Sequence, residues 1–179
     1  MTALGWRDRW MGEANREYHT TPVLELRESA QRLGLVRKYR GVLLPTKVGR
    51  ILESDPVALW WHVADHLPEA RTEAETDAGM LVLLMVGSGT PISTTVLARH
   101  LTTGMAALGW RTARTGEPLD EHRAFAAGRS TWTALRRLGA LLDDDWGGPP
   151  APATPAGIQL ARAAVLRRER RAYRPSSEE

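Results

Sequence analysis

Apolar residues recur every three or four positions along most of the chain, which predicts a protein built mainly from amphipathic helices. One such segment puts Trp6, Trp10 and Tyr18 along one face of a first helix. A second runs from Thr21 to Leu33, with a Thr-Pro pair suited to a helix start, and is followed by Gly34, a residue type that commonly ends helices. The predicted fold class is therefore mainly α.

The hydrophobic period changes after Gly34. The run LVRKYRGVLL, residues 35–44, has β-branched and aromatic residues around a central glycine, which predicts a short β-hairpin with basic residues near its turn. Thr46 is a good N-cap for a further helix, and residues 56–67 form another amphipathic segment. Helix, hairpin and helix in this order are typical of a winged-helix module.

The second half is also predicted to be helical. Residues 71–86 have acidic residues first and an apolar second half, with a glycine-rich stop at Gly87 and Gly89. Ser93 is an N-cap for the next helix, whose predicted inward face is Val96, Leu97, Leu101, Met105 and Leu108. Residues 118–126 and 130–138 are predicted to be two helices joined by a tight glycine turn at 127–129, the helix-turn-helix arrangement.

The segment from Leu33 to Leu52 resembles a second segment about a hundred residues later in the chain. Residues 32–36 match residues 137–141 at an offset of 105, and residues 46–49 align with residues 154–157 at an offset of 108. Two anchors in the same order indicate an internal duplication, with a second and longer wing predicted at 143–152, although short motifs can also agree by chance. The prediction is two tandem winged-helix-like modules, residues 1–67 and 68–172, followed by a disordered tail at 173–179.

Two runs carry a family resemblance. RLGLVRKYRGVLLPTKVGRILESDPVALWWHVADHL, residues 32–67, and PLDEHRAFAAGRSTWTALRRLGAL, residues 118–141, resemble the C-terminal winged-helix region of the actinobacterial plasmid ORF-three-like proteins. The similarity extends from about Thr20 to Arg167. It implies a tandem winged-helix architecture and transfers no catalytic residues. Proteins of that family have a separate β-rich domain upstream, which this sequence lacks.

The composition is ordinary for a globular protein, with 42% hydrophobic and 25% charged residues. The absence of cysteine excludes disulfides, thiolate nucleophiles and cysteine-ligated metal sites, and it suits a reducing cytoplasm. The first residues lack the apolar core of a signal peptide, and the longest uncharged apolar run, residues 78–86, is too short for a bilayer span. The predicted location is cytoplasmic, with no membrane partner.

Charge is distributed unevenly along the chain. Residues 1–50 hold ten Lys or Arg against five Asp or Glu, whereas residues 51–100 hold two against seven. Basic ends around an acidic middle indicate a nucleic-acid-binding face. The competing interpretation is genomic base composition, because the basic residues are almost all arginine.

A winged helix presents the helix before its wing to the DNA major groove, while the wing and flanking basic residues hold phosphates. The predicted DNA-binding residues of the first module are Arg27, Gln31, Arg32, Arg37, Lys38, Arg40, Lys47 and Arg50. Those of the second module are Arg129, Thr133, Arg136, Arg137, Arg167 and Arg168. Glu25 and Glu28 on the first helix, and the aspartates 143–145 in the second wing, oppose phosphate binding.

No residue set in the sequence indicates catalysis, a cofactor or a metal. His62 and His66 are four residues apart, but Val63 stands where a zinc-protease motif has its glutamate, and a third ligand is not evident nearby. The predicted function is a non-enzymatic DNA-binding or transcription-accessory protein whose partner is double-stranded DNA. The alternative is a protein-interaction module on the same scaffold, with a protein partner or a second copy of the chain.

Overall fold

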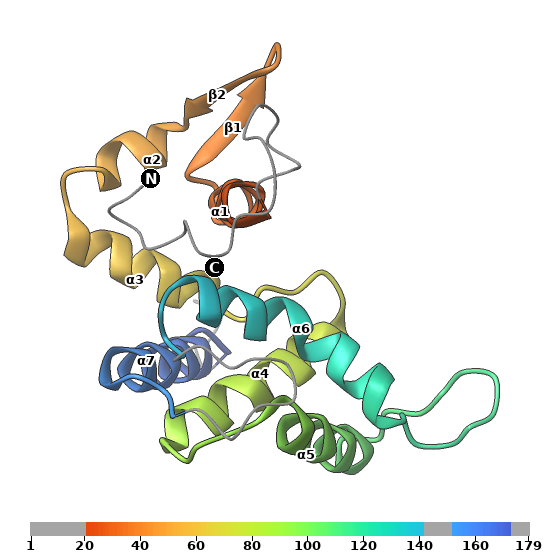
Figure 1. Ribbon diagram of the computed structural model, residues 1–179. Helices are drawn as coiled ribbons and strands as arrows, with labels where there is room; N and C mark the ends of the chain where they lie inside the picture. The colour runs from red at the N-terminus through yellow and green to blue at the C-terminus, as the bar shows by residue number, and fades with distance from the viewer. Residues whose placement is uncertain (1–20, 142–151, 173–179) are drawn as a thin grey trace, which may run out of the picture. The chain divides into compact units, whose positions relative to one another are not determined.

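The computed structural model describes residues 21–141 and 152–172, and Figure 1 shows its course. The described residues form seven helices and one sheet of two antiparallel strands, so the prediction of a mainly α protein is confirmed. The chain divides into two compact units, residues 1–59 and 60–179. Each unit is described by itself below.

The first unit contains a helix, a hairpin and a short helix, as its sequence predicts. Helix α1 spans Thr21–Arg32, strands β1 and β2 span Val36–Tyr39 and Val42–Pro45, and helix α2 spans Lys47–Leu52. The strands pair with Val36 opposite Pro45 and Tyr39 opposite Val42. Helix α3, Pro56–His66, then crosses the boundary between the units.

The hairpin turns through two residues, Arg40 and Gly41, which have φ angles of 49° and 83°. Positive φ at both central positions is the signature of a type I′ turn, whose twist matches that of the flanking strands. Gly41 accepts this conformation without strain, whereas Arg40 has a Cβ atom that disfavours it.

The second unit is built around helix α4, Glu73–Ser88. Helices α5, Thr94–Ala107, α6, Glu121–Arg137, and α7, Pro155–Ala172, all pack against α4 (Figure 1). The side chains of Thr72, Ser93 and Asp120 cap the N-termini of α4, α5 and α6 by accepting a hydrogen bond from a backbone N–H. The fully buried core side chains include Val82, Leu83, Val86, Leu97, Leu101, Met105 and Leu135.

The helix-turn-helix predicted for residues 118–138 is wrong. Residues 121–137 form a single uninterrupted helix, not two helices joined by a turn at 127–129. Gly128 is buried, and a Cβ atom there would lie 2.9 Å from Leu101 Cδ1 and 3.1 Å from Val82 Cγ2. The glycine therefore lets α6 approach α4 and α5 closely and does not end a helix. The helix-turn-helix predicted within this segment is absent.

Two smaller predictions also need correction. Leu108 lies at the C-cap of α5 and is 56% exposed, so it is not part of the inward face. Gly87 lies inside α4, and the helix stop is Gly89 alone, with a φ of 78°. The predicted second wing, 143–152, lies almost wholly outside the described residues, as do Trp6, Trp10 and Tyr18.

Candidate nucleic-acid interface

The two sequence anchors end their helices in the same way. After α1, Gly34 N donates to Gln31 O at 3.0 Å and Leu35 N donates to Ala30 O at 2.9 Å. After α6, the corresponding bonds run from Gly139 N to Arg136 O at 3.0 Å and from Ala140 N to Leu135 O at 2.9 Å. Both glycines have positive φ, 68° and 67°. Each helix therefore ends in a Schellman motif that turns the chain toward a β-bridge, Val36 to Pro45 or Leu141 to Ala153.

The same two anchors start the next helix in the same way. The Thr46 hydroxyl donates to Gly34 O at 2.6 Å and accepts from Gly49 N at 3.0 Å. The Thr154 hydroxyl donates to Gly139 O at 3.1 Å and accepts from Gly157 N at 3.0 Å. In each case one threonine joins the end of one helix to the start of the next, beside the β-bridge. The two segments that are similar in sequence therefore also have the same pattern of hydrogen bonds.

The connection between α5 and α6 has part of this arrangement. Trp110 N donates to Met105 O at 2.9 Å across Gly109, whose φ is 89°, and Arg111 forms a β-bridge with Pro118. The next helix is capped by Asp120, one position later than the threonines of the other two connections relative to the bridge. Its hairpin is tied to α4 by a hydrogen bond from Trp110 Nε1 to Asp77 Oδ2 at 2.9 Å.

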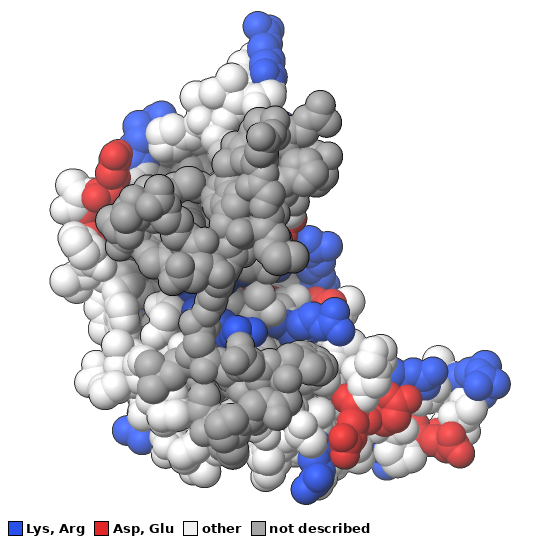
Figure 2. Space-filling view, in the orientation of Figure 1, with Lys and Arg blue, Asp and Glu red and all other residues white. Residues whose placement is uncertain are grey.

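Among the residues that the structure describes, positive charge without nearby acidic residues is concentrated at the hairpin tip, which we define as residues 37–42. Arg37, Lys38 and Arg40 are all exposed there, and Tyr39 is 49% exposed between two of them. Arg37 Cζ lies 5.7 Å and Arg40 Cζ 5.3 Å from the centroid of the Tyr39 ring. Figure 2 shows basic side chains at the end of the hairpin. Residues 33–52 contain no Asp or Glu.

The other residues predicted for the first unit are less available. Arg32 is paired with Glu28 of the same helix at 3.3 Å, which reduces its net charge toward a phosphate. Arg27 and Gln31 are half-buried. Lys47 is exposed at the start of α2, and Arg50 donates to Pro45 O at 3.4 Å while remaining exposed. The structure therefore gathers Arg37, Lys38 and Arg40, and leaves α1 without a basic face.

In the second unit the outward face of α6 is basic. Its half-buried to exposed residues, at spacings of three and four, are His122, Ala126, Arg129, Thr133 and Arg136. Arg129 Cζ lies 6.0 Å from the Phe125 ring centroid. Arg136 and Arg137 each already interact with another group of the protein, so Arg129 is the predicted α6 cation best placed for an external ligand.

Arg167 has a structural role that the sequence did not indicate. Its Nε and Nη2 atoms donate to the two carboxylate oxygens of Asp65 at 2.7 and 3.0 Å, and its guanidinium lies 5.0 Å from the Trp61 ring centroid. This contact ties α7 to α3 across 102 residues of sequence, so Arg167 is not free for phosphate. Arg168 is exposed on the same helix.

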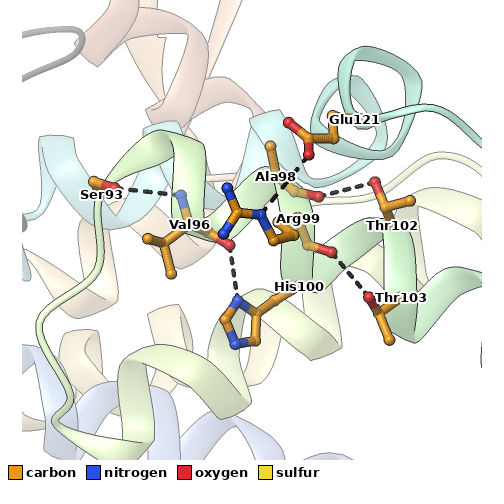
Figure 3. A network of polar contacts seen from close by, with 8 residues as sticks. All are labelled: Ser93, Val96, Ala98, Arg99, His100, Thr102, Thr103 and Glu121. Atoms are coloured by element: carbon orange, nitrogen blue, oxygen red, sulfur yellow. Dashed lines mark hydrogen bonds and ion pairs between the residues drawn. The ribbon is translucent and has the colours of Figure 1, made fainter.

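The polar side chains of α5 are used within the helix and at its edge (Figure 3). Thr102 donates to Ala98 O at 3.0 Å, and His100 Nδ1 lies 2.8 Å from Val96 O. Arg99 Nε is 4.0 Å from Glu121 Oε1, at the start of α6. These are local helix contacts, and they do not bring a nucleophile, a base and an orienting group together.

Two negative findings apply to the described residues. They contain no cluster of three or more His, Asp or Glu side chains that could hold a metal ion. The rings of His62 and His66 are 4.1 Å apart, and His66 Nδ1 lies 2.7 Å from the backbone oxygen of His62, so the pair is organised by its own helix. None of the described helices has the length and apolar character needed to cross a bilayer.

An apolar groove between α4 and α7 was not predicted. It has a volume of about 380 Å³ and is lined by Leu83, Leu84, Gly87, Ser88, Arg162, Val165 and Leu166. Leu84 and Leu166 are 53% and 57% exposed. Arg162, one of the lining residues, donates from Nε to Gly87 O at 2.7 Å.

Comparison with protein-family models, curated proteins and solved structures gives no match for this chain. The resemblance to the plasmid ORF-three-like proteins therefore stays a prediction from the sequence.

Proposed function

We propose that the protein is a non-enzymatic, cytoplasmic binder of double-stranded DNA, of the transcription-accessory kind, which uses two winged-helix-like modules. The observation that carries this proposal is the acid-free basic hairpin tip of residues 37–42. It follows α1 through the same Gly and Thr hydrogen bonds that organise the connection after α6. A narrow two-stranded ribbon that ends in three cations fits a DNA groove and its phosphates.

The α6 face supports the same function in the second module. Arg129 and Thr133 stand on the helix that precedes the Leu141–Ala153 bridge, where a winged helix has its groove-reading helix. The two modules therefore contribute different parts. The first offers a basic hairpin beside a helix that carries Glu28, and the second offers a basic helix.

A duplex titration tests the proposal. Each phosphate neutralised contributes about 0.9 to the slope of log affinity against log salt concentration, so the substitutions Arg37→Gln, Lys38→Gln and Arg40→Gln together should reduce that slope by about 2 to 3. The matched control, Arg99→Gln, Arg123→Gln and Arg162→Gln, also removes three positive charges. Two of those arginines have carboxylate partners and the third donates to Gly87. Absence of duplex binding at low salt, or equal losses in both triple variants, would refute the proposal.

The apolar groove favours a second candidate function, protein binding through a second copy of this chain. Helix α4 is apolar around most of its circumference, as expected of a helix buried on all sides, yet Leu84 is exposed. Charge complementarity points to a second copy as the occupant. Arg162 and Glu169 are exposed and seven residues apart, so they lie two turns apart on the groove side of α7. Antiparallel pairing of two α7 helices about Val165 and Leu166 sets each arginine opposite the other copy's glutamate.

Light scattering during size-exclusion chromatography checks this second candidate. The dimer mass should be lost in Leu166→Glu and kept in Leu138→Glu, where the substituted leucine is 45% exposed outside the groove. A wild-type protein that remains monomeric at high concentration contradicts the second candidate and leaves DNA binding unaffected.

A further inference from the structure

Tyr39 is the exposed aromatic side chain at the hairpin tip. It is the last residue of β1 and lies opposite Val42, which is 59% exposed. Directly opposite residues of an antiparallel pair project from the same face, so the Tyr39 ring and Val42 form one small apolar surface. The guanidinium groups of Arg37 and Arg40 lie beside it. A flat apolar surface flanked by cations is complementary to a nucleobase with its adjoining phosphates.

The backbone of Arg40 adopts a conformation that a residue with a Cβ atom disfavours. Its φ of 49° lies in the left-handed region, where Asn, Asp or Gly is the favoured first residue of a type I′ turn. Strained positions of this kind cluster at binding and catalytic sites. Arginine at this position places a third cation at the tip, beside Tyr39.

The contacts of Arg37 and Arg40 with the Tyr39 ring are weak enough to be exchanged for contacts with a phosphate. Cation–π contacts between exposed groups are weak, and both guanidinium groups are held more than 5 Å from the ring centroid. A phosphate attracts the guanidinium groups more strongly than the ring does, because charge-assisted hydrogen bonds form with its oxygens. When the arginines move to phosphates, the Tyr39 ring is uncovered for stacking.

In a fully paired duplex the faces of the bases are hidden by stacking on their neighbours. An aromatic side chain reaches a base face of paired DNA only by forcing two base pairs apart, whereas an unpaired nucleotide, as in a single-stranded extension, offers its face without that cost. We propose that Tyr39 stacks on an unpaired base, so that the preferred ligand is duplex DNA joined to a single strand. This inference rests on the proposed DNA binding and adds the class of DNA.

Fluorescence anisotropy with two labelled DNAs tests the proposal. One probe is a fully paired duplex, and the other is the same duplex with a short single-stranded extension. The wild-type chain should bind the extended DNA about tenfold more tightly, which is the size expected for one base stacked on an aromatic ring. Tyr39→Ser should abolish this preference, so that the variant binds the two DNAs with equal affinity, whereas Tyr39→Phe should keep it.

Salt separates stacking from charge in the same experiment. The effect of Tyr39→Ser should stay constant as salt rises, whereas the effect of the triple hairpin variant should shrink. Equal affinity of the wild-type chain for the two DNAs, or equal losses on both DNAs in Tyr39→Ser, overturns the stacking role while duplex binding stands. Failure to bind either DNA removes the proposed function as well. Circular dichroism of each variant checks that the fold is retained.

Discussion

Substitution of Gly157 by alanine tests the close approach between a helix start and the end of the preceding helix. The same arrangement occurs within each of the two units. Alanine is the better helix former, by about 1 kcal/mol, so helix propensity alone predicts that Gly157→Ala stabilises α7. The packing predicts the opposite. A Cβ atom at Gly157 would lie 2.6 Å from Cα and 2.7 Å from C of Ala140, closer than the 3.0 Å below which real Cβ atoms are essentially never found. Those atoms belong to the backbone and cannot move aside as a flexible side chain can.

The size of the effect follows from the bonds that hold the two segments together. If Ala140 and the start of α7 move apart, the bond from Thr154 N to Ala140 O at 2.9 Å and the bond from Thr154 Oγ1 to Gly139 O at 3.1 Å are both weakened. Each such hydrogen bond contributes about 1 kcal/mol, and overpacking costs about 1–3 kcal/mol. After the gain of about 1 kcal/mol in helix propensity, the net loss should be about 2–4 kcal/mol.

Urea denaturation monitored by circular dichroism measures this loss as a lower midpoint. The matched control is Gly87→Ala, also in a helix of the second unit, where the nearest atom to a new Cβ is Arg162 Cγ at 3.3 Å. That side chain is exposed and can shift, so the control should unfold within about 1 kcal/mol of the wild type. A Gly157→Ala variant as stable as the control would refute the close approach between α7 and Ala140. Gly49→Ala repeats the test in the first unit, where the backbone of Leu35 occupies the corresponding space.

Three further substitutions have defined outcomes. Arg40→Asn should raise the free energy of unfolding by about 1 kcal/mol, because asparagine tolerates the left-handed conformation, and should weaken DNA binding in the same titration; lower stability would contradict the turn assignment. Thr131→Val should raise the free energy of unfolding by about 1–2 kcal/mol, because the buried Thr131 hydroxyl lacks a hydrogen-bond partner among the described residues. A clearly lower melting temperature of the variant would mean that the hydroxyl does have a partner. Asp65→Ala should lower the free energy of unfolding by about 1–2 kcal/mol, a modest value because the Arg167 side chain is 42% exposed. The control Glu169→Ala, which removes a carboxylate from the helix of Arg167, should lower the urea midpoint less.

Local chemistry was predicted best. Thr46 and Ser93 act as the predicted N-caps, and Gly34 ends a helix where the sequence places it. A cap depends on hydrogen bonds to residues two or three positions away, so a single sequence contains all the information required. The hairpin follows the same rule, because its two-residue turn fixes the register of the strands.

Gly128 shows where local chemistry is insufficient. A glycine after two alanines is compatible with a turn or with a close helix contact, and the neighbours that decide between them, Val82 and Leu101, are 46 and 27 residues away. Arg167 illustrates the same limit at the candidate interface. Its predicted role in phosphate binding overlooked Asp65, 102 residues earlier. By contrast, the loss of Arg32 to Glu28 was foreseeable, since residues four apart share a helix face.

By itself, the sequence determined the mainly helical class, the N-caps at Thr46 and Ser93, and the basic hairpin of residues 37–42, because each depends on period, capping or a tight turn. Tertiary structure alone decided which cations remain outward, that α6 is continuous, and that a groove opens between α4 and α7. These outcomes depend on contacts between residues far apart in sequence. Burial and charge pairing are properties of the neighbours that folding brings together.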